Sequence, residues 1–345
     1  MNENALKPVY SDPSHLVILG AGASVASSLK NPEPNGKKLP SMLDFIEVVG
    51  LEDIVQSLPI EFDSENFEDV YSKLYEKDPQ SDIINEIERR VSEYFISMKL
   101  PPEPTIYDYL VMSLRPKDVI ATFDWDPFLY DAFWRNHTKT RLPWSIYLHG
   151  NVRIGHCVRD MRKGLVGTHC SKCKLPFTPS KLLFPITQKN YSADPYMKTE
   201  WTAFADALKH SRLVTVFGYS VPKTDVEAIR LMSEAWGTSG DRNLEQFEII
   251  DIQAEDIVYE RWAKFIYPGH YDYSTDYFDS RLGLSPRRTA EVYMHKIHPS
   301  TAEEALRNER NPVPRNFTTL EEIWTWFDPL IEAEEEASQL EDSDQ

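Results

Sequence analysis

The sequence is poor in cysteine and glycine, with 3 and 13 of them in 345 residues. Three cysteines cannot build a disulfide framework, and so few glycines exclude collagen-like repeats and flexible Gly-rich linkers. No apolar run approaches the roughly 18 residues that a membrane-spanning helix needs. The N-terminal residues also lack the basic-then-apolar pattern of a secretory signal. The sequence therefore predicts a cytoplasmic protein with no membrane segment.

Positive charge is also in short supply, with 37 Lys and Arg against 55 Asp and Glu and a formal net charge of −18. A general nucleic-acid binder needs a basic face to displace counterions from phosphates, so no direct nucleic-acid binding is expected. The hydrophobic share of 41% and the charged share of 27% are those of a globular protein. The length allows one large domain or two modest ones.

The acidity is concentrated in two places. Residues 51–100 hold 13 acids and five bases, and residues 332–345 hold seven acids and no base. Ile84, Ile87, Val91 and Phe95 follow a helical spacing, so the first block belongs to an expected helical insert, 40–115. The second is expected to be an acidic disordered tail. By contrast, residues 151–190 hold eight bases and one acid, which sets them apart as a separate module.

Five short apolar runs predict strands, and helical patterns lie between some of them, notably at 200–209 and 225–235. The strand candidates are 15–19, 119–123, 146–148, 213–217 and 247–250. Buried strands that alternate with helices predict an α/β fold, a Rossmann-like parallel sheet with helices on both faces. We expect this domain to span 14–262, with a C-terminal extension, 263–331, packed on it. Ligands of such folds bind at the carboxyl ends of the strands.

The first strand is followed by a glycine turn that contains Gly20, Ala21, Gly22 and Ser24. Two glycines let the backbone turn tightly and approach a pyrophosphate, whose charge the start of the next helix favours. Val25 stands in the third glycine position of a dinucleotide fingerprint, so the motif is incomplete. The alternative is that the turn only packs a helix on the sheet.

Two carboxylates, Asp124 and Asp126, follow the second strand. They lie two residues apart on an extended segment and would face the same side, so both could address ribose hydroxyls or a water. Asp126 could instead cap the following helix, with Pro127 at its first position.

His149 follows the third strand and precedes Gly150, where it could act as a general base near neutral pH. Its alternative role is that of a core histidine with satisfied hydrogen bonds. Gly218 and Ser220 follow the fourth strand and Asp251 follows the fifth. Ser220 could bond a phosphate or ribose and Asp251 a ribose diol, although each alone is also a common turn residue.

The order of these motifs resembles the sirtuin superfamily, and more closely the sirtuin-like NAD hydrolase effectors of bacterial antiviral defence. The resemblance spans roughly residues 16–251. It implies that Gly20, Ala21, Gly22 and Ser24 hold the pyrophosphate of NAD+, that Asp124 and Asp126 face the nicotinamide ribose, and that His149 is the catalytic histidine. It also assigns the adenosine half of NAD+ to Gly218, Ser220 and Asp251.

Two departures from the family shape the expected function. The family has Asn where this chain has Asp124, and the Pro-Asp-Phe-Arg segment of deacylating sirtuins is replaced by Ser-Ser-Leu-Lys-Asn-Pro at 27–32. The resemblance therefore implies an NAD+ hydrolase, and two alternatives stay open. The first is a catalytically weak NAD or nucleotide sensor, and the second is an NAD-dependent protein deacylase.

All three cysteines, Cys157, Cys170 and Cys173, fall inside the basic module. Two residues between Cys170 and Cys173 let both sulfurs reach one tetrahedral ion, which predicts half of a structural zinc site. Asp160 stands where the family has its fourth cysteine, and His156 and His169 are rival ligands. A metal-free module with reduced thiols is the alternative.

An ungated NAD+ hydrolase would be toxic to its own cell, so we expect control by a homo-oligomer or a regulatory protein partner. Two aromatic segments, 267–278 and 323–327, are candidate interfaces. They could equally cover the sheet or the insert.

Overall fold

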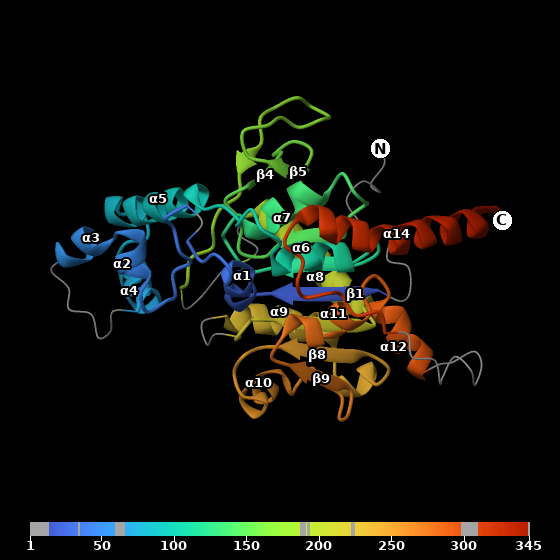
Figure 1. The fold of residues 1–345 in the computed structure, drawn as a ribbon. Helices are drawn as coiled ribbons and strands as arrows, with labels where there is room; N and C mark the ends of the chain where they lie inside the picture. Colours follow the sequence, from blue (N-terminus) through green and yellow to red (C-terminus); the bar gives the residue numbers. More distant parts are fainter. Residues whose placement is uncertain are drawn as a thin grey trace.

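Six parallel strands form the central sheet of the computed structural model, which describes residues 14–343 except 34, 59–65, 187–190, 192–193, 222–224 and 298–309. They lie in the order β3-β2-β1-β7-β8-β9, and every neighbouring pair is parallel. Figure 1 shows β1 and, below it, β8 and β9. The strands are β1 (His15–Leu19), β2 (Val119–Thr122), β3 (Trp144–Tyr147), β7 (Leu213–Phe217), β8 (Gln246–Ile250) and β9 (Tyr271–Ser274).

This strand order is that of a Rossmann-like fold. Numbered along the chain within the sheet, the strands read 3-2-1-4-5-6, so the direction of winding reverses between β1 and β7. Every residue of β1, β2, β7 and β8 is buried, as in a parallel sheet covered on both faces. The predicted fold class is confirmed.

Strand β9 lies in the segment that the sequence assigns to a C-terminal extension. Its four residues pair with β8 and complete one edge of the sheet, although all four remain partly exposed. The sequence Tyr-Asp-Tyr-Ser alternates aromatic and polar residues, but it is only four residues long and has no apolar run, so no strand is predicted there. Much of the aromatic segment 267–278 therefore covers and extends the sheet.

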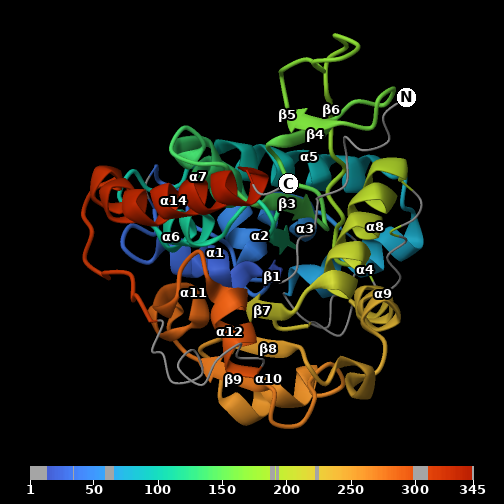
Figure 2. The same cartoon turned by 90° about the vertical axis from the view of Figure 1, so that its right-hand side faces the viewer.

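Helices flank the sheet on two sides, as Figure 2 shows. On one side lie α8 (Pro195–His210) and α9 (Val226–Trp236), and on the other lie α1 (Ala21–Ser28), α6 (Ile106–Ser113) and α7 (Phe128–Asn136). Helix α10 (Glu255–Trp262) follows β8.

The helical insert extends to one side of the sheet in Figure 1. Its helices are α2 (Phe45–Val49), α3 (Glu52–Gln56), α4 (Phe67–Lys77) and α5 (Asp82–Ser97). Their apolar faces meet in an aromatic cluster in which the rings of Phe45 and Phe67 stack at 4.1 Å. The ring of Trp125, which lies between the two predicted carboxylates, packs edge-on against Phe95 at 5.8 Å. The insert therefore touches the loop that carries Asp124 and Asp126.

Helices follow β9 in the C-terminal part of the chain and include the segment 332–343 of the predicted acidic tail. They include α11 (Arg281–Leu284), α12 (Thr289–Ile297) and α14 (Leu320–Ser343). Helix α14 runs through most of the segment 332–345, of which 344–345 lie outside the described residues. Ile323, Phe327 and Ile331 are buried and bind its first half to the body of the molecule. Glu334 of the acidic segment forms an ion pair with Arg287, and the disordered acidic tail, 332–345, stays a prediction.

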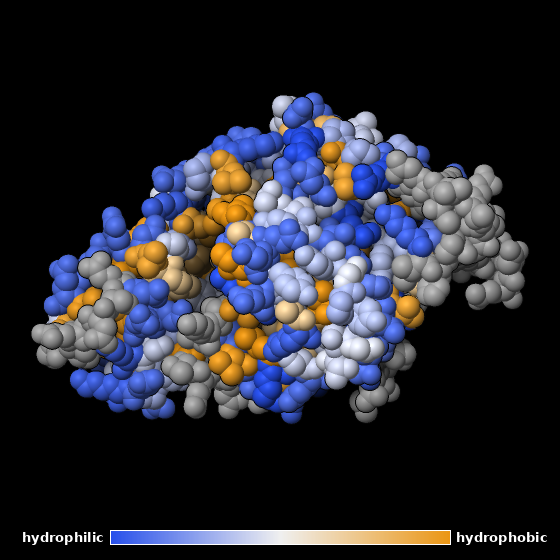
Figure 3. Space-filling view, turned by 90° about the horizontal axis from the view of Figure 1, so that it is seen from below, coloured by the Kyte–Doolittle hydropathy of each residue, from blue (hydrophilic) through white to orange (hydrophobic). Residues whose placement is uncertain are grey.

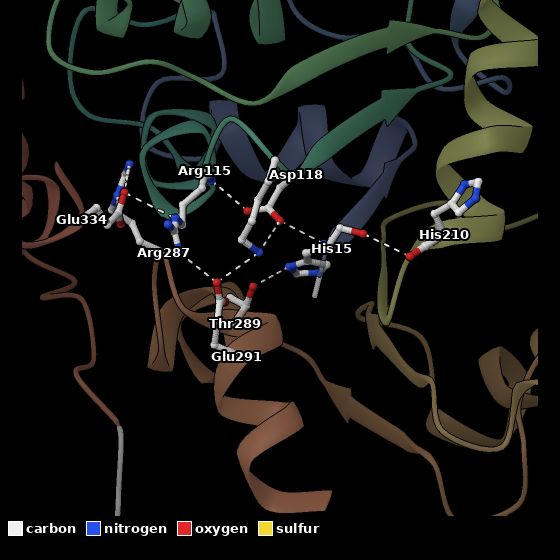
Figure 4. A network of polar contacts seen from close by, with 10 residues as sticks. His15, Arg115, Asp118, His210, Arg287, Thr289, Glu291 and Glu334 are labelled. Atoms are coloured by element: carbon white, nitrogen blue, oxygen red, sulfur yellow. Dashed lines mark hydrogen bonds and ion pairs between the residues drawn. The ribbon is translucent and has the colours of Figure 1, made fainter. Parts of the chain in front are cut away.

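A network of buried polar groups closes the amino edge of the sheet (Figure 4). The ring of His15 contacts the hydroxyls of Thr289 (2.8 Å) and Thr215 (2.7 Å), and burial lowers the pKa of His15 well below its ordinary value. Arg287 is buried at φ +63° and forms a two-pronged ion pair with Glu334 at 2.6 Å. Thr289 thus connects α12 to β1, and Arg287 connects Glu334 of α14 to the carbonyls of Met112 and Leu114.

Among the described residues, no helix has both the length and the apolar character required to cross a membrane.

Candidate functional site

Tight glycine contacts join the β1–α1 turn to the end of β7, where the winding of the sheet reverses. A Cβ on Gly22 would lie 2.7 Å from the Cα of Gly218, and Gly218 itself has φ +63°. The N–H of Gly22 donates to the carbonyl of Gly218 at 3.0 Å. The glycines of this turn are thus required for packing. Because packing alone accounts for these glycines, a role of the turn in binding a pyrophosphate stays a proposal. Its support is that the turn leads into the start of α1, which favours an anion.

The loop after β2 brings Asp124 and Asp126 to the carboxyl edge of the sheet. One oxygen of Asp124 accepts hydrogen bonds from the hydroxyls of Thr122 (3.1 Å), Ser24 (3.3 Å) and Tyr107 (3.5 Å). Asp126 accepts from the N–H of Phe128, the first residue of α7, at 3.0 Å, although the N-cap position itself is taken by Pro127. Three hydroxyls therefore bind one oxygen of Asp124. The residue is partly exposed and lines a cavity.

Both carboxyl groups have raised pKa values. Burial is the main cause for each, and the charge of Asp126 raises the pKa of Asp124 further. No basic side chain among the described residues pairs with either group. Burial and the neighbouring charge thus favour the protonated form of Asp124, and a positive charge placed in this cavity would favour ionisation of the pair.

His149 lies close to this pair, in the loop after β3. Its ring packs edge-on against Phe123 at 4.8 Å, and Phe123 in turn stacks on Tyr219 at 4.1 Å. The Nε2 atom of His149 lies 2.9 Å from the hydroxyl of Tyr191 and 3.9 Å from a carboxylate oxygen of Asp225. The imidazole is thus held in one orientation, with polar partners on one side.

Two adjoining cavities open along the strand ends. The smaller cavity, about 250 Å³, is lined by Asp124, Asp126 and His149. The larger cavity, about 780 Å³, extends towards the end of β8. They share Ala21, Val25, Gly218 and Ser220. Figure 3 shows a hollow between the insert and the body, with apolar side chains at its rim; the exposed side chains of Val25, Leu29 and Met42 line these cavities.

The predicted ligand-binding residues all line one or both of these cavities. The smaller cavity is lined by Gly20, Ser24, Asp124, Asp126 and His149, the larger by Gly22 and Asp251, and both by Ala21, Gly218 and Ser220. Residues far apart in the sequence therefore meet at one place, which is the crevice where Rossmann-like folds bind ligands.

A small antiparallel sheet carries the cysteine module, in the order β5-β4-β6. Its strands are β4 (Ile154–His156), β5 (Lys163–Leu165) and β6 (Thr178–Pro179). Residues 187–190 of the predicted module lie outside the described residues. Two matched turns supply the donor atoms: Met161 and Lys174 both have positive φ, each one residue after the second donor of its turn. Asp160 thus occupies the position in the first turn that Cys173 occupies in the second.

Four side chains of this module can hold a metal ion. The donor atoms of Cys157, Asp160, Cys170 and Cys173 all lie within 4.8 Å of one another. Three thiolates and one carboxylate around a single point suit Zn²⁺. Lys172 lies 3.0 Å from the second oxygen of Asp160 and orients the carboxylate.

The rival ligands lie apart from this group. His156 stacks on Tyr196 at 4.6 Å, and His169 is exposed. Of the candidates for the fourth donor, Asp160 is therefore the one that the fold brings to the three sulfurs.

Two substitutions of Asp160, the fourth donor, should change zinc retention in opposite directions. We expect Asp160→Cys to retain zinc longer against a chelator, because thiolate is the softer ligand. Asp160→Asn should weaken zinc binding by at least about tenfold, the effect that even an outer-shell partner has. Metal content and the rate of zinc release are the measurements, with Asp206→Asn on α8 as the control. Equal release from all three variants would contradict the site.

Several residues of the site escaped the sequence analysis. Tyr107 lies in α6 and contacts Ser24 at 2.8 Å, and Tyr191 and Asp225 lie beside His149. Asn151 contacts the loop of the two carboxylates. Of these, two had a local signal: Asn151 directly follows the His-Gly pair, and Asp225 follows the turn after the fourth strand. The others reach the site through long-range packing.

The molecule thus belongs to the class of Rossmann-like α/β proteins with a ligand crevice at the switch point of the sheet. No protein-family model matches the chain, and no curated protein does. Among solved structures, it is similar to a Sir2 homologue in complex with NAD, at 15% identity over 79% of this chain and 88% of that one, with a TM-score of 0.36. It is also similar to a mutant Sir2 homologue in complex with 2′-O-acetyl-ADP-ribose, at 15% identity over 88% and 99%, with a TM-score of 0.38. Because these identities and TM-scores are low, the fold class is assigned from the strand order and not from these similarities.

Proposed function

We propose that this chain is an NAD+ glycohydrolase, which converts NAD+ and water to nicotinamide and ADP-ribose. The observation that carries the proposal is the pair of carboxyl groups, Asp124 and Asp126, beside His149 at the strand ends. Their pKa values are raised and no basic side chain among the described residues compensates them. Such a pair favours a substrate that brings positive charge, and cleavage of NAD+ places that charge on the ribose.

The two adjoining cavities support a dinucleotide as the ligand. The nicotinamide ribose would lie in the smaller cavity and the adenosine half in the larger, where Asp251 could accept hydrogen bonds from ribose hydroxyls. The joint between them is formed partly by Ala21, the first residue of α1. The positive end of the helix dipole there suits the pyrophosphate.

The reaction would begin when the bond between nicotinamide and ribose breaks. The electron pair of that bond leaves with the ring, which departs as neutral nicotinamide and leaves a cationic ribose. The positive charge of bound NAD+ would favour the ionised form of Asp124, whose carboxylate would stabilise this centre. His149 would accept a proton from the attacking water, whose oxygen forms the new bond to the ribose.

Asp124→Asn tests this role. The amide can still accept hydrogen bonds from the three hydroxyls but carries no charge, so we expect nicotinamide release to fall about 100-fold. Purified protein is incubated with NAD+, and nicotinamide, ADP-ribose and cyclic products are resolved by chromatography. Asp206→Asn is the control and should keep wild-type turnover.

A large gain in rate with Asp124→Asn would contradict the proposal. It would favour the alternative of a weakly active nucleotide sensor, in which the carboxylate replaces a more competent amide. Turnover of an acylated peptide with stoichiometric nicotinamide release would favour the deacylase instead.

Gating by a homo-oligomer or a protein partner, and a role in antiviral defence, stay predictions of the family resemblance. If an isolated chain releases no nicotinamide, the same assay is repeated with co-purified partners. Activity that depends on the partner or on protein concentration would support gating.

A further inference from the structure

Asn151 links the two loops that carry the polar residues of the site. It follows the His149–Gly150 pair and is buried, with 1% of its surface exposed. Its side-chain Nδ2 donates to the backbone carbonyl of Asp126 at 2.6 Å and to that of Asp124 at 3.3 Å. Its Oδ1 accepts from the N–H of Arg153 at 2.9 Å. Because carbonyls only accept and a backbone N–H only donates, these partners fix the orientation of the amide.

The next residue completes the contact between the loops. The N–H of Val152 donates to the carbonyl of Trp125 at 3.1 Å. Three consecutive carbonyls, those of residues 124–126, are therefore held by Asn151 and Val152. A carbonyl released from these bonds could rotate its peptide plane, and the flanking carboxyl groups would turn with it.

Asn151 itself is fixed from the other side by the segment that leaves the cysteine module. The hydroxyl of Ser180 accepts from its N–H at 3.1 Å and donates to its carbonyl at 2.9 Å. Gly150, at φ +77°, passes so close to Lys181 that a Cβ would lie 2.2 Å from its carbonyl oxygen. The amide thus projects from a rigid backbone.

We infer that Asn151 is the positioning residue that sets Asp124 and Asp126 relative to His149 through its side-chain N–H groups. It acts through the backbone of the carboxylate loop rather than on the substrate. The inference rests on the proposed NAD+ hydrolysis and extends it to a residue outside the cavity.

Asn151→Asp isolates the donor function. The variant has the same shape and keeps an acceptor for the N–H of Arg153, but it presents oxygen instead of NH₂ to the two carbonyls. We expect kcat for nicotinamide release to fall about 100-fold, the cost of a displacement near 1 Å at a reacting centre. KM for NAD+ should change less than about threefold, because most of the dinucleotide would bind outside this loop.

A second readout does not depend on activity. Hydrogen exchange at the N–H groups of Asp124 and Phe128, which donate within the carboxylate loop, should speed up at least about tenfold in Asn151→Asp. Ser180→Ala is the matched control, since it loosens the same backbone but keeps both side-chain bonds. Its kcat should stay within about threefold of wild type. Asn151→Ala replaces Asn151→Asp if the latter does not fold.

The outcomes separate the two claims. If the wild-type chain with its partners does not hydrolyse NAD+, the proposed function fails, and the exchange experiment still decides the role of Asn151. If Asn151→Asp keeps kcat within twofold and exchange is unchanged, the inference is overturned. An equal loss of kcat in Ser180→Ala would also overturn it, because general loosening would then explain the effect.

Discussion

Replacing His149 by alanine is expected to lower NAD+ hydrolysis at least about 100-fold, because general base catalysis contributes 10²–10⁴-fold. The ring is held by Phe123 and Tyr191 in a cavity with both carboxyl groups, so no other imidazole among the described lining residues can replace it. Nicotinamide release under saturating NAD+ is the measurement. Added imidazole should restore part of the rate, since the variant leaves room for it.

Two further variants separate chemistry from packing. His210→Ala removes a half-exposed histidine at the end of α8 and should leave the rate unchanged. Tyr191→Phe removes the hydroxyl that contacts Nε2 but keeps the stacked ring, so we expect a loss below about tenfold. If His149→Ala keeps more than half of the wild-type rate, the assignment of the base is wrong.

Replacing Glu334 by alanine is expected to lower the free energy of unfolding by about 3 kcal/mol, because it leaves the buried Arg287 without its carboxylate. Arg115, whose guanidinium lies 3.5 Å from Glu334, would lose a partner as well. Chemical denaturation monitored by tryptophan fluorescence measures the change.

The neighbouring residue provides the control. Glu335 is exposed on the same helix and has the same charge, so Glu335→Ala should change stability by less than about 0.5 kcal/mol. Equal effects of the two substitutions would mean that helix α14 is not anchored through Glu334. The comparison also tests whether the segment after residue 331 is ordered in solution.

Local sequence signals predicted the buried strands and the residues that follow them. Strands β1 and β7 coincide with the predicted runs 15–19 and 213–217. Each is a short, mostly β-branched or aliphatic run, which is typical of a buried strand. The residues at their carboxyl ends could then be placed at one edge, since all strands of a parallel sheet point the same way.

Elements that depend on contacts with distant parts of the chain were not predicted. Strand β9 has no apolar run and exists because β8 offers it an edge. The second half of helix α14 lies in the predicted acidic tail, 332–345, because acids dominate that segment, whereas Ile331 is buried before it and Glu334 pairs with Arg287. Neither the partner strand nor the buried arginine can be read from the segment itself.

The sequence by itself determined five strands of the central sheet, the polar residues at their ends and the spacing of the cysteines, because these are local patterns with fixed geometric meaning. The tertiary structure alone decided that Asp124, Asp126 and His149 share a cavity and that Asp160 joins the three sulfurs. It also decided that Asn151 connects the carboxylate loop to the loop of His149. These relations follow from close packing between distant segments, which composition and periodicity do not encode.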